Sequence, residues 1–371
     1  MVCKHFGECG SCNVYELSYA EQVDNKEKEV VKLLAPFYKN SLEIFTSESS
    51  SYRARSEFRI WHENTICYYA MGNSEKNGSI NIEECPKVIN PIKKRMWRLL
   101  EAVNASQDIL KKRLFSVEFL ASTTDECLIT MLYHRKLDEV WSEEAKKLET
   151  VLQCKIMGRS RKQKVILSDD FVIEKLPIDK KIFTYKQYES GFTQPNPLVN
   201  IKMIVWAIKQ AKKVGYGDFL ESYCGLGNFT LPLSHYFDKV LATEISKRSI
   251  QSALENCELN GIHNISFVRL SSEEMSEALN EVRAFNRLRE IDLKSYHFST
   301  VLVDPPRAGL DEGTMDLIST IEYIIYISCN PQTLARDLER LAQTHTVLEG
   351  AIFDQFPHTN HIESGVFLKK K

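Results

Sequence analysis

The segment GDFLESYCGLGNFTLPLSHYFDKVLATE, residues 217–244, joins two short apolar runs through a loop with two glycines and a helical stretch. We expect strands at 218–223 and 240–244, because these runs are short, apolar and bounded by turn-forming residues. Glycine lets the backbone turn tightly and approach a ligand, and the helix after the loop offers free N–H groups. The segment therefore predicts one strand–loop–helix–strand unit with a candidate ligand loop.

Outward from this unit, helical and strand-like stretches alternate as far as residue 368. We expect helices at 201–214 and 247–261, and strands at 265–270, 298–304, 323–328, 345–353 and 362–368. Strands that alternate with helices form a mostly parallel sheet wound on both faces, a Rossmann-like α/β fold. Ligands of such sheets bind at the carboxyl ends of the strands, so the residues after each strand are the candidates for chemistry.

The residues before 186 follow another pattern. Residues 13–35 predict a helix that ends near Pro36, and helices are expected around 91–105 and 137–152 among short strand-like runs. We therefore predict three parts: an N-terminal cysteine segment and helix (1–45), a mixed α+β, β-rich central domain (46–185) and the α/β domain (186–371).

Composition places the chain among ordinary globular proteins, with 371 residues, 43% apolar and 26% charged. It has no apolar run of 18 residues, and its first residues lack the apolar core of a signal peptide. We expect a cytoplasmic protein without a membrane span and without an obligate protein partner. In a reducing cytosol its ten cysteines are expected to serve in metal binding, catalysis or packing rather than in disulfides.

Positive charge is concentrated in the central part of the chain. The net charge is −2, but residues 51–185 carry 24 Lys and Arg against 19 Asp and Glu. Phosphate backbones require local positive surface, so the central domain is a candidate for RNA binding. Any single charge cluster is more often a solvated face, and only the asymmetry favours RNA.

The loop at 223–229 is followed by an acid at a spacing that is typical of nucleoside-binding sites. Glu244 ends the next strand, nineteen residues after Gly225, where an acid commonly binds ribose hydroxyls. A dinucleotide fingerprint would have a third glycine at position 230, where this chain has Thr230. This pattern favours S-adenosylmethionine over NAD, with a plain structural turn as the alternative.

Two later strands end in residues suited to covalent chemistry. Asp304 is followed by two prolines, which stop the strand, and Cys329 stands before Asn330 and a proline. A thiolate that adds to C6 of uracil makes C5 nucleophilic toward a methyl donor, and a base must then remove the C5 proton. Glu363, near the last strand, is a candidate for that base, although by position it could equally be a surface glutamate. Cys224 and Cys257 are interpreted as buried packing residues.

These motifs together resemble the RNA uracil-5-methyltransferases, and most of all the members that form 5-methyluridine in the T-loop of tRNA. The matching stretches cover most of the chain: YRARSEFRIWH (52–62), FTQPN (192–196), YCGLGNF (223–229), ATE (242–244), DPPR (304–307), ISCNP (327–331), and 353–365 with FDQFP and HIESG. The resemblance implies S-adenosylmethionine-dependent methylation of uridine C5 by residues 186–371, on a base extruded from the T-arm or from another T-loop-like RNA. It implies Cys329 as nucleophile and Glu363 as base, a cofactor site lined by Gln194, Tyr223, Asn228, Glu244 and Asp304, and RNA contacts at Phe192, Arg59 and His134.

One feature departs from the simplest tRNA enzymes. Cys3, Cys9 and Cys12, with Cys85 at a distance, resemble the iron–sulfur ligands of the family's 23S rRNA branch. They imply a [4Fe–4S] cluster, with zinc as the alternative. That branch usually carries a β-barrel module before these cysteines, and this chain begins at residue 1 without it, so we expect tRNA rather than 23S rRNA.

Three rival functions compete with this expectation. A 23S rRNA methyltransferase would use the same chemistry. An amino-group methyltransferase fits less well, since it needs no thiol and prefers an aromatic residue where this chain has Arg307. A noncatalytic RNA-binding or RNA-folding protein is disfavoured because every expected catalytic position is filled.

Overall fold

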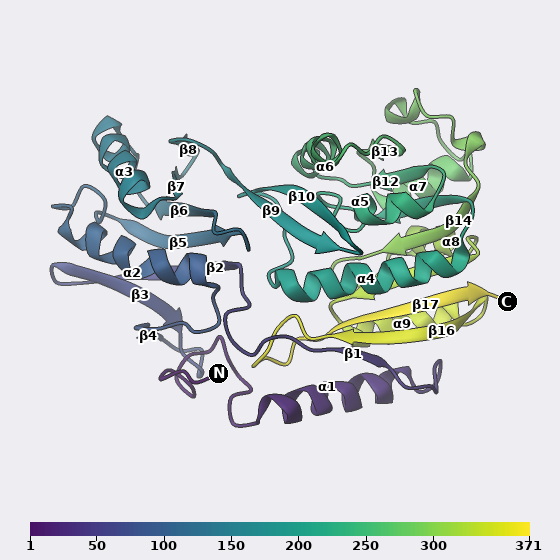
Figure 1. Cartoon of the computed structure of the whole chain (residues 1–371), viewed down its shortest axis with the longest axis horizontal. Coiled ribbons are helices and arrows are strands. Elements are labelled where there is room, and N and C mark those ends of the chain that lie inside the picture. Colours follow the sequence, from purple (N-terminus) through teal and green to yellow (C-terminus); the bar gives the residue numbers. More distant parts are fainter.

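The computed structural model describes residues 1–371, and its strands form three sheets arranged in two lobes (Figure 1). One lobe is built on an eight-stranded sheet and the other on a seven-stranded sheet. A two-stranded hairpin lies between them. None of the helices is long and apolar enough to cross a membrane.

The eight-stranded sheet has the order β1-β16-β17-β15-β14-β11-β12-β13. Its strands are β1 (Glu43–Phe45), β11 (Asp218–Ser222), β12 (Val240–Thr243), β13 (Ile265–Val268), β14 (Phe298–Val303), β15 (Tyr323–Ser328), β16 (His345–Phe353) and β17 (Glu363–Lys370). The five strands from β15 to β13 are parallel, and β17 runs antiparallel between β15 and β16. The predicted Rossmann-like sheet is confirmed.

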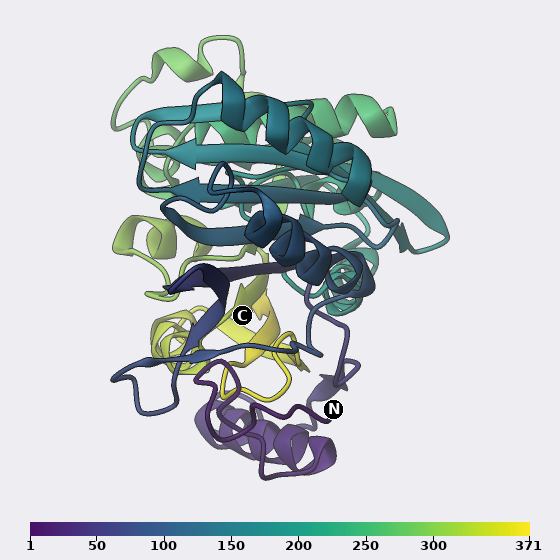
Figure 2. The ribbon, with the colours of Figure 1, turned by 90° about the vertical axis from the view of Figure 1, so that its left-hand side faces the viewer.

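Helices cover both faces of this sheet. They are α1 (Tyr19–Leu34), α4 (Pro197–Val214), α5 (Thr230–Leu233), α6 (Lys247–Asn260), α7 (Ser272–Leu279), α8 (Glu312–Ile318) and α9 (Pro331–Leu341), with 3-10 turns at Ser234–Tyr236, Asn286–Leu288 and Leu293–Ser295. Side chains of α1, α7, α8 and α9 share one core, and those of α4, α5 and α6 share the other. Figures 1 and 2 both place α1 beside the C-terminal strands, where β1 pairs with β16.

The seven-stranded sheet has the order β4-β3-β2-β5-β6-β7-β8 and carries its own core against two helices. Its elements are β2 (Arg55–Glu63), β3 (Ile66–Gly72), β4 (Ser79–Asn81), α2 (Asn90–Ala105), β5 (Leu114–Ala121), β6 (Cys127–Tyr133), α3 (Glu139–Leu152), β7 (Lys155–Ser160) and β8 (Gln163–Ile166). All neighbours are antiparallel except β6 and β7, which α3 connects. The predicted β-rich central region thus has a mixed α+β structure.

The hairpin of β9 (Phe171–Ile178) and β10 (Lys181–Tyr188) packs toward the C-terminal lobe. Its buried Leu176 and Tyr185 belong to the same core cluster as Trp206 of α4. The division at residue 185 stays a prediction, although these contacts favour counting the hairpin with the lobe of the eight-stranded sheet.

Two details differ from the sequence-based expectation. The helix expected over 13–35 begins only at Tyr19, because Ser18 caps it: its hydroxyl accepts from the Glu21 N–H, and the Glu21 carboxylate accepts from the Ser18 N–H. The strand β1 was not expected, since three residues are too few to show a pattern, and it is formed by pairing with β16.

Candidate active site

A cleft of about 980 Å³ lies at the carboxyl ends of the parallel strands and extends to β2 of the other lobe. Six predicted site residues line it together: Gln194, Tyr223, Glu244, Asp304, Cys329 and Glu363. These residues come from separate segments of the chain. Their meeting in one cleft agrees with the rule that ligands of such sheets bind at strand ends.

At one end of the cleft, the loop after β11 is fixed to the acid after β12. The Glu244 carboxylate accepts hydrogen bonds from the Gly225 N–H (3.1 Å) and the Ser246 N–H (2.8 Å). Gly225 has a φ of +55°, which favours glycine, and no atom lies within 4 Å of the position that a Cβ would take. The open space at this loop, beside a carboxylate, suits a nucleoside with ribose hydroxyls.

At the other end, three strand ends bring together a thiol and two carboxyls. β15 and β17 are antiparallel neighbours with Ser328 opposite Ser364, so Cys329 and Glu363 lie at the same edge of the sheet. Asp304 follows β14, which is the neighbour of β15 on its other side. Residues that are distant in sequence therefore meet because of strand order.

Electrostatics disfavours ionisation of all three groups. Withdrawal from water raises the pKa of Asp304 to about 7. Burial, with the negative charges of Glu363 and Asp304, raises the pKa of the Cys329 thiol to about 11. Burial and Asp304 also hold the pKa of Glu363 well above its usual value. Perturbed groups gathered in a cleft are typical of an active site.

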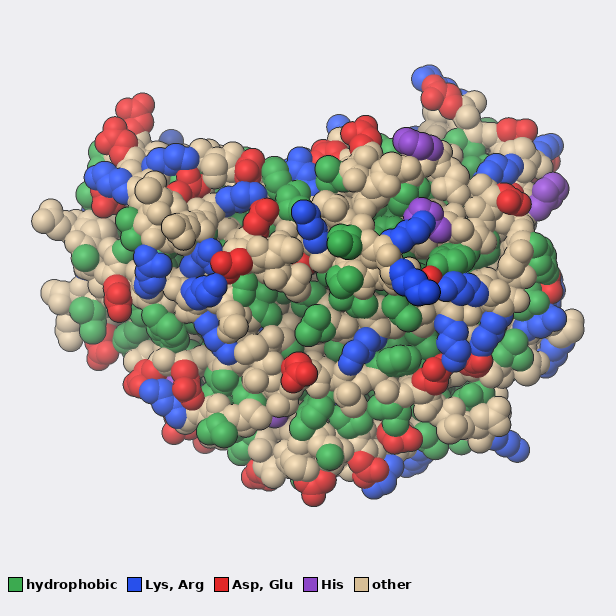
Figure 3. Space-filling model, viewed as in Figure 1, with side chains coloured by type: hydrophobic (Ala, Val, Ile, Leu, Met, Phe, Trp, Pro, Cys, Tyr) green, Lys and Arg blue, Asp and Glu red, His purple; other side chains and the backbone are tan.

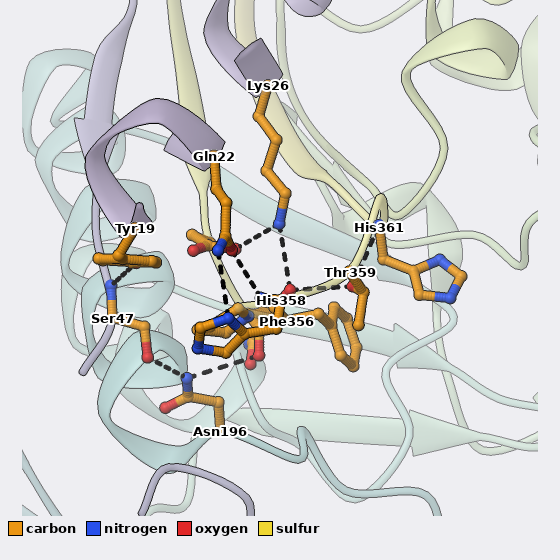
Figure 4. Close-up of polar contacts among 12 residues, drawn as sticks. Tyr19, Gln22, Lys26, Ser47, Asn196, Phe356, His358, Thr359 and His361 are labelled. Carbon is orange, nitrogen blue, oxygen red and sulfur yellow. Dashed lines mark hydrogen bonds and ion pairs between the residues drawn. The ribbon is translucent and has the colours of Figure 1, made fainter. Parts of the chain in front are cut away.

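A buried polar network holds the loop that precedes Glu363 (Figure 4). Lys26 of α1 donates to the Asp354 carboxylate (2.7 Å) and to the Phe356 carbonyl (3.1 Å). The Gln22 side chain accepts from the His358 N–H at 2.9 Å and also contacts the His358 ring. Because α1 binds this loop at three points, it fixes the position from which β17 starts.

Asn228 is the one predicted cofactor residue that does not line the cleft. Its side-chain amide exchanges hydrogen bonds with the amide of Asn200 on α4, at 2.8 and 2.9 Å. Its backbone carbonyl accepts from the Tyr185 hydroxyl. These contacts hold the loop onto α4 and the hairpin, and a direct role of Asn228 in cofactor binding stays a prediction.

The three predicted RNA contacts lie at different places. Phe192 lines the cleft and is 72% exposed. Arg59 lines an adjoining hollow of about 870 Å³ together with Phe115. His134 stacks on Phe115 with ring centroids 4.4 Å apart. Phe115 was not identified from the sequence as a residue of this hollow. It lies at a bulge in β5 between residues 114 and 116, and such a bulge is not visible in the sequence.

Basic side chains are less concentrated than the sequence suggested. On the face seen in Figure 3 they lie over both lobes. Three of the four on α4 are paired with acids: Lys209 with Glu43, Lys212 with Asp179 and Lys213 with Glu349. The lining of the cleft therefore indicates the substrate side better than the distribution of charge does. Arg53 and Lys87 line the cleft and were not assigned to the site from the sequence.

The four predicted metal-binding cysteines line one small cavity between the N-terminal segment and the seven-stranded lobe. Cys3, Cys9, Cys12 and Cys85 all border it, and none forms a disulfide. No group of three or more His, Cys, Asp or Glu side chains is placed to hold a single metal ion. The thiols are thus gathered in one place, but they do not converge on one point.

The sheet and its cleft define a class of protein: a Rossmann-like enzyme with a nucleoside-cofactor loop beside a candidate cysteine nucleophile. A family model described as tRNA (Uracil-5-)-methyltransferase matches residues 18–371, and the chain belongs to this family. The predicted family, its S-adenosylmethionine-dependent methyltransferase class and the cofactor S-adenosylmethionine are thereby confirmed.

Relatives and a solved structure agree with this assignment. A protein of a Sulfurovum species, named tRNA/tmRNA (uracil-C(5))-methyltransferase, is 74% identical over 371 residues and covers 100% of both chains. One of the same name from a Nitratiruptor species is 51% identical, again over 100% of both. The fold is shared with the Pyrococcus abyssi tRNA (uracil-54, C5)-methyltransferase in complex with S-adenosyl-L-homocysteine, at 22% identity and a TM-score of 0.71, over 96% of this chain and 85% of that one.

Proposed function

We propose that this protein methylates C5 of the T-loop uridine of tRNA, with Cys329 as the covalent nucleophile and Glu363 as the base. The observation that carries the proposal is the meeting of Cys329, Glu363 and Asp304 at adjacent strand ends, in the same cleft as the Glu244 loop. The relatives named for tRNA and tmRNA favour tRNA over 23S rRNA, and a tRNA substrate implies a cytoplasmic enzyme.

The reaction divides into steps that these residues can perform. Cys329 releases its proton to water and, as the thiolate, adds to C6 of the uracil, which places electron density on C5. S-adenosylmethionine, when bound, supplies the electrophilic methyl group that C5 takes. Glu363 then removes the C5 proton, and the bond between sulfur and C6 breaks to release the product and the thiolate. Glu363 must be ionised for this step, and its raised pKa makes the carboxylate a stronger base once the proton has left.

The cofactor would occupy the end of the cleft next to the Gly225 loop. We assign Glu244 to the ribose hydroxyls, since its carboxylate is already held by two backbone N–H groups. Tyr223, Gln194 and Asp304 would line the remainder, and Asn228 would contribute by fixing the loop against Asn200.

RNA would approach from the lobe with the seven-stranded sheet. The target base must leave its stack to present C6 to Cys329, and the exposed Phe192 ring at the cleft offers a stacking surface. Arg59 and the stacked pair of Phe115 and His134 would bind the flanking RNA of the T-arm.

The substrate proposal has a direct test. Purified protein and labelled S-adenosylmethionine should methylate tRNA but not 23S rRNA fragments, and nucleoside mapping should find 5-methyluridine missing from the T-loop in cells that lack the protein. Labelling of rRNA alone would overturn the choice of substrate, while labelling of neither RNA would overturn the proposed reaction.

We also propose that Cys3, Cys9, Cys12 and Cys85 hold a [4Fe–4S] cluster that ties the N-terminal segment to the seven-stranded lobe. Four free thiols around one cavity suit a cluster, in which each thiolate binds a different iron. Zinc, which four thiolates also bind, is the alternative. Anaerobically purified protein should contain iron and acid-labile sulfide, and stoichiometric zinc without sulfide would reject the cluster.

A further inference from the structure

Arg307, close in the fold to the proposed nucleophile, makes two contacts and has no role in the steps proposed above. The Arg307 guanidinium contacts Nδ1 of His361 at 2.5 Å. Its backbone carbonyl accepts from the side-chain amide of Asn330, the residue after Cys329, at 3.2 Å. The backbone of Arg307 is therefore held next to the Cys329 segment, and its side chain is held by His361.

Arg307, Cys329 and His361 also form the boundary between two hollows. All three line the main cleft, and all three line a second hollow of about 210 Å³ at the start of α9. Arg307 and Cys329 thus border the same two hollows. His361 stands two residues before Glu363, so the contact between Arg307 and His361 joins the segment after Asp304 to the segment that carries the base.

Acidic side chains around Cys329 disfavour its thiolate, so a nearby positive charge would stabilise that form. Asp304 and Glu363 face it from β14 and β17, and Glu29 of α1 lines the second hollow, where the Gln332 amide donates to it. Partial burial and the neighbouring Arg307 lower the pKa of His361, which favours its neutral form. Arg307 is the positive group that opposes the acids at both Cys329 and Glu363.

We propose that Arg307, oriented by His361, is a positioning residue that stabilises the thiolate of Cys329 in the covalent step. The inference rests on the proposed role of Cys329 as nucleophile. The unprotonated Nδ1 of His361 accepts from the guanidinium and fixes its direction, so loss of the imidazole should have a smaller effect of the same kind. Lysine at position 307 retains the charge and should retain most of the effect.

The test measures how readily the Cys329 thiol ionises in the absence of RNA. Iodoacetamide labelling of Cys329, followed by mass spectrometry of its peptide over a range of pH, reports how readily the thiol ionises. Arg307→Gln should slow labelling at pH 8 about tenfold, since an opposite charge nearby commonly shifts a pKa by at least one unit. Arg307→Lys should stay within about threefold of the natural protein, and His361→Ala should fall between them.

A matched control uses Arg340, an exposed arginine in the last turn of α9 that pairs with Asp316. Arg340→Gln removes the same charge from the far end of the helix and should leave labelling of Cys329 unchanged. If the pH profile of Arg307→Gln coincides with that of the natural protein, the inference is wrong. Failure of the natural protein to join 5-fluorouridine tRNA would instead reject the proposed function, while the labelling profiles still decide the role of Arg307.

Discussion

Two polar clusters lie on either side of the segment 354–363; one is a buried ion pair, and the other is a half-buried group of acids beside an exposed arginine. Toward α1, Lys26 meets Asp354 as a pair of opposite charges, with side chains 7% and 2% exposed. Toward the sheet edge, Cys329, Asp304 and Glu363 are three acids gathered together with Arg307 as the opposing charge. We expect the paired cluster to stabilise the fold, whereas the cluster of acids contains the groups proposed to act in catalysis. On this hypothesis, charge pairing rather than burial alone distinguishes structural from catalytic groups.

The largest effect is expected from Cys329→Ala. Without the thiol, C6 of the uracil is not attacked and methylation of tRNA should fall by more than about 10⁴-fold, as for other covalent nucleophiles. The measurement is labelled-methyl transfer to tRNA, with thermal unfolding as the control for folding. Retention of full turnover would remove Cys329 from the mechanism.

The next effect is expected from Glu363→Gln, which keeps the shape of the base but removes its function. Turnover should fall by about 10²–10⁴-fold, because proton removal from C5 is impaired. The RNA should stay joined to Cys329 after methyl transfer, so a denaturant-resistant complex should accumulate on gels with ordinary tRNA. If turnover falls but no complex accumulates, Glu363 acts before methyl transfer rather than after it.

A third effect is expected from Lys26→Met, which removes the buried ion pair between Lys26 and Asp354. Loss of one partner leaves Asp354 buried and unpaired, and the free energy of unfolding should fall by about 3–5 kcal/mol. Denaturant unfolding provides the measurement. Lys28→Met is the matched control, since the pair of Lys28 with Asp24 is exposed and its loss should not change stability measurably. Equal stability of the two variants would contradict the distinction between the clusters.

The smallest change is a dependence on pH in the natural protein. Because the pKa of Cys329 is about 11, the thiolate fraction grows with pH throughout the working range. Single-turnover methyl transfer should therefore rise by about tenfold per pH unit from near neutrality into the mildly alkaline range. A flat profile would show that ionisation of Cys329 does not limit the reaction.

The sequence predicted the parts of this molecule that local pattern and strand-end chemistry determine. The alternation from residue 201 onward predicts the parallel sheet, and the residues at the ends of its strands, such as Glu244, Asp304 and Cys329, line the cleft. Contacts between distant parts of the chain could not be predicted from the sequence. β1 exists only through β16, Phe115 lies at a bulge, and Arg307 meets His361 across 54 residues. Such contacts depend on tertiary packing, which leaves no periodic signal.

The central claim, a covalent bond between Cys329 and the pyrimidine, has one direct test. In 5-fluorouridine tRNA the fluorine at C5 cannot leave as a proton does, so the bond to the enzyme should persist after methyl transfer. Intact-protein and peptide mass spectrometry should find the nucleotide on Cys329 in near-stoichiometric amount, and none on the Cys329→Ala variant. Absence of any adduct, or an adduct on another residue, would contradict the account.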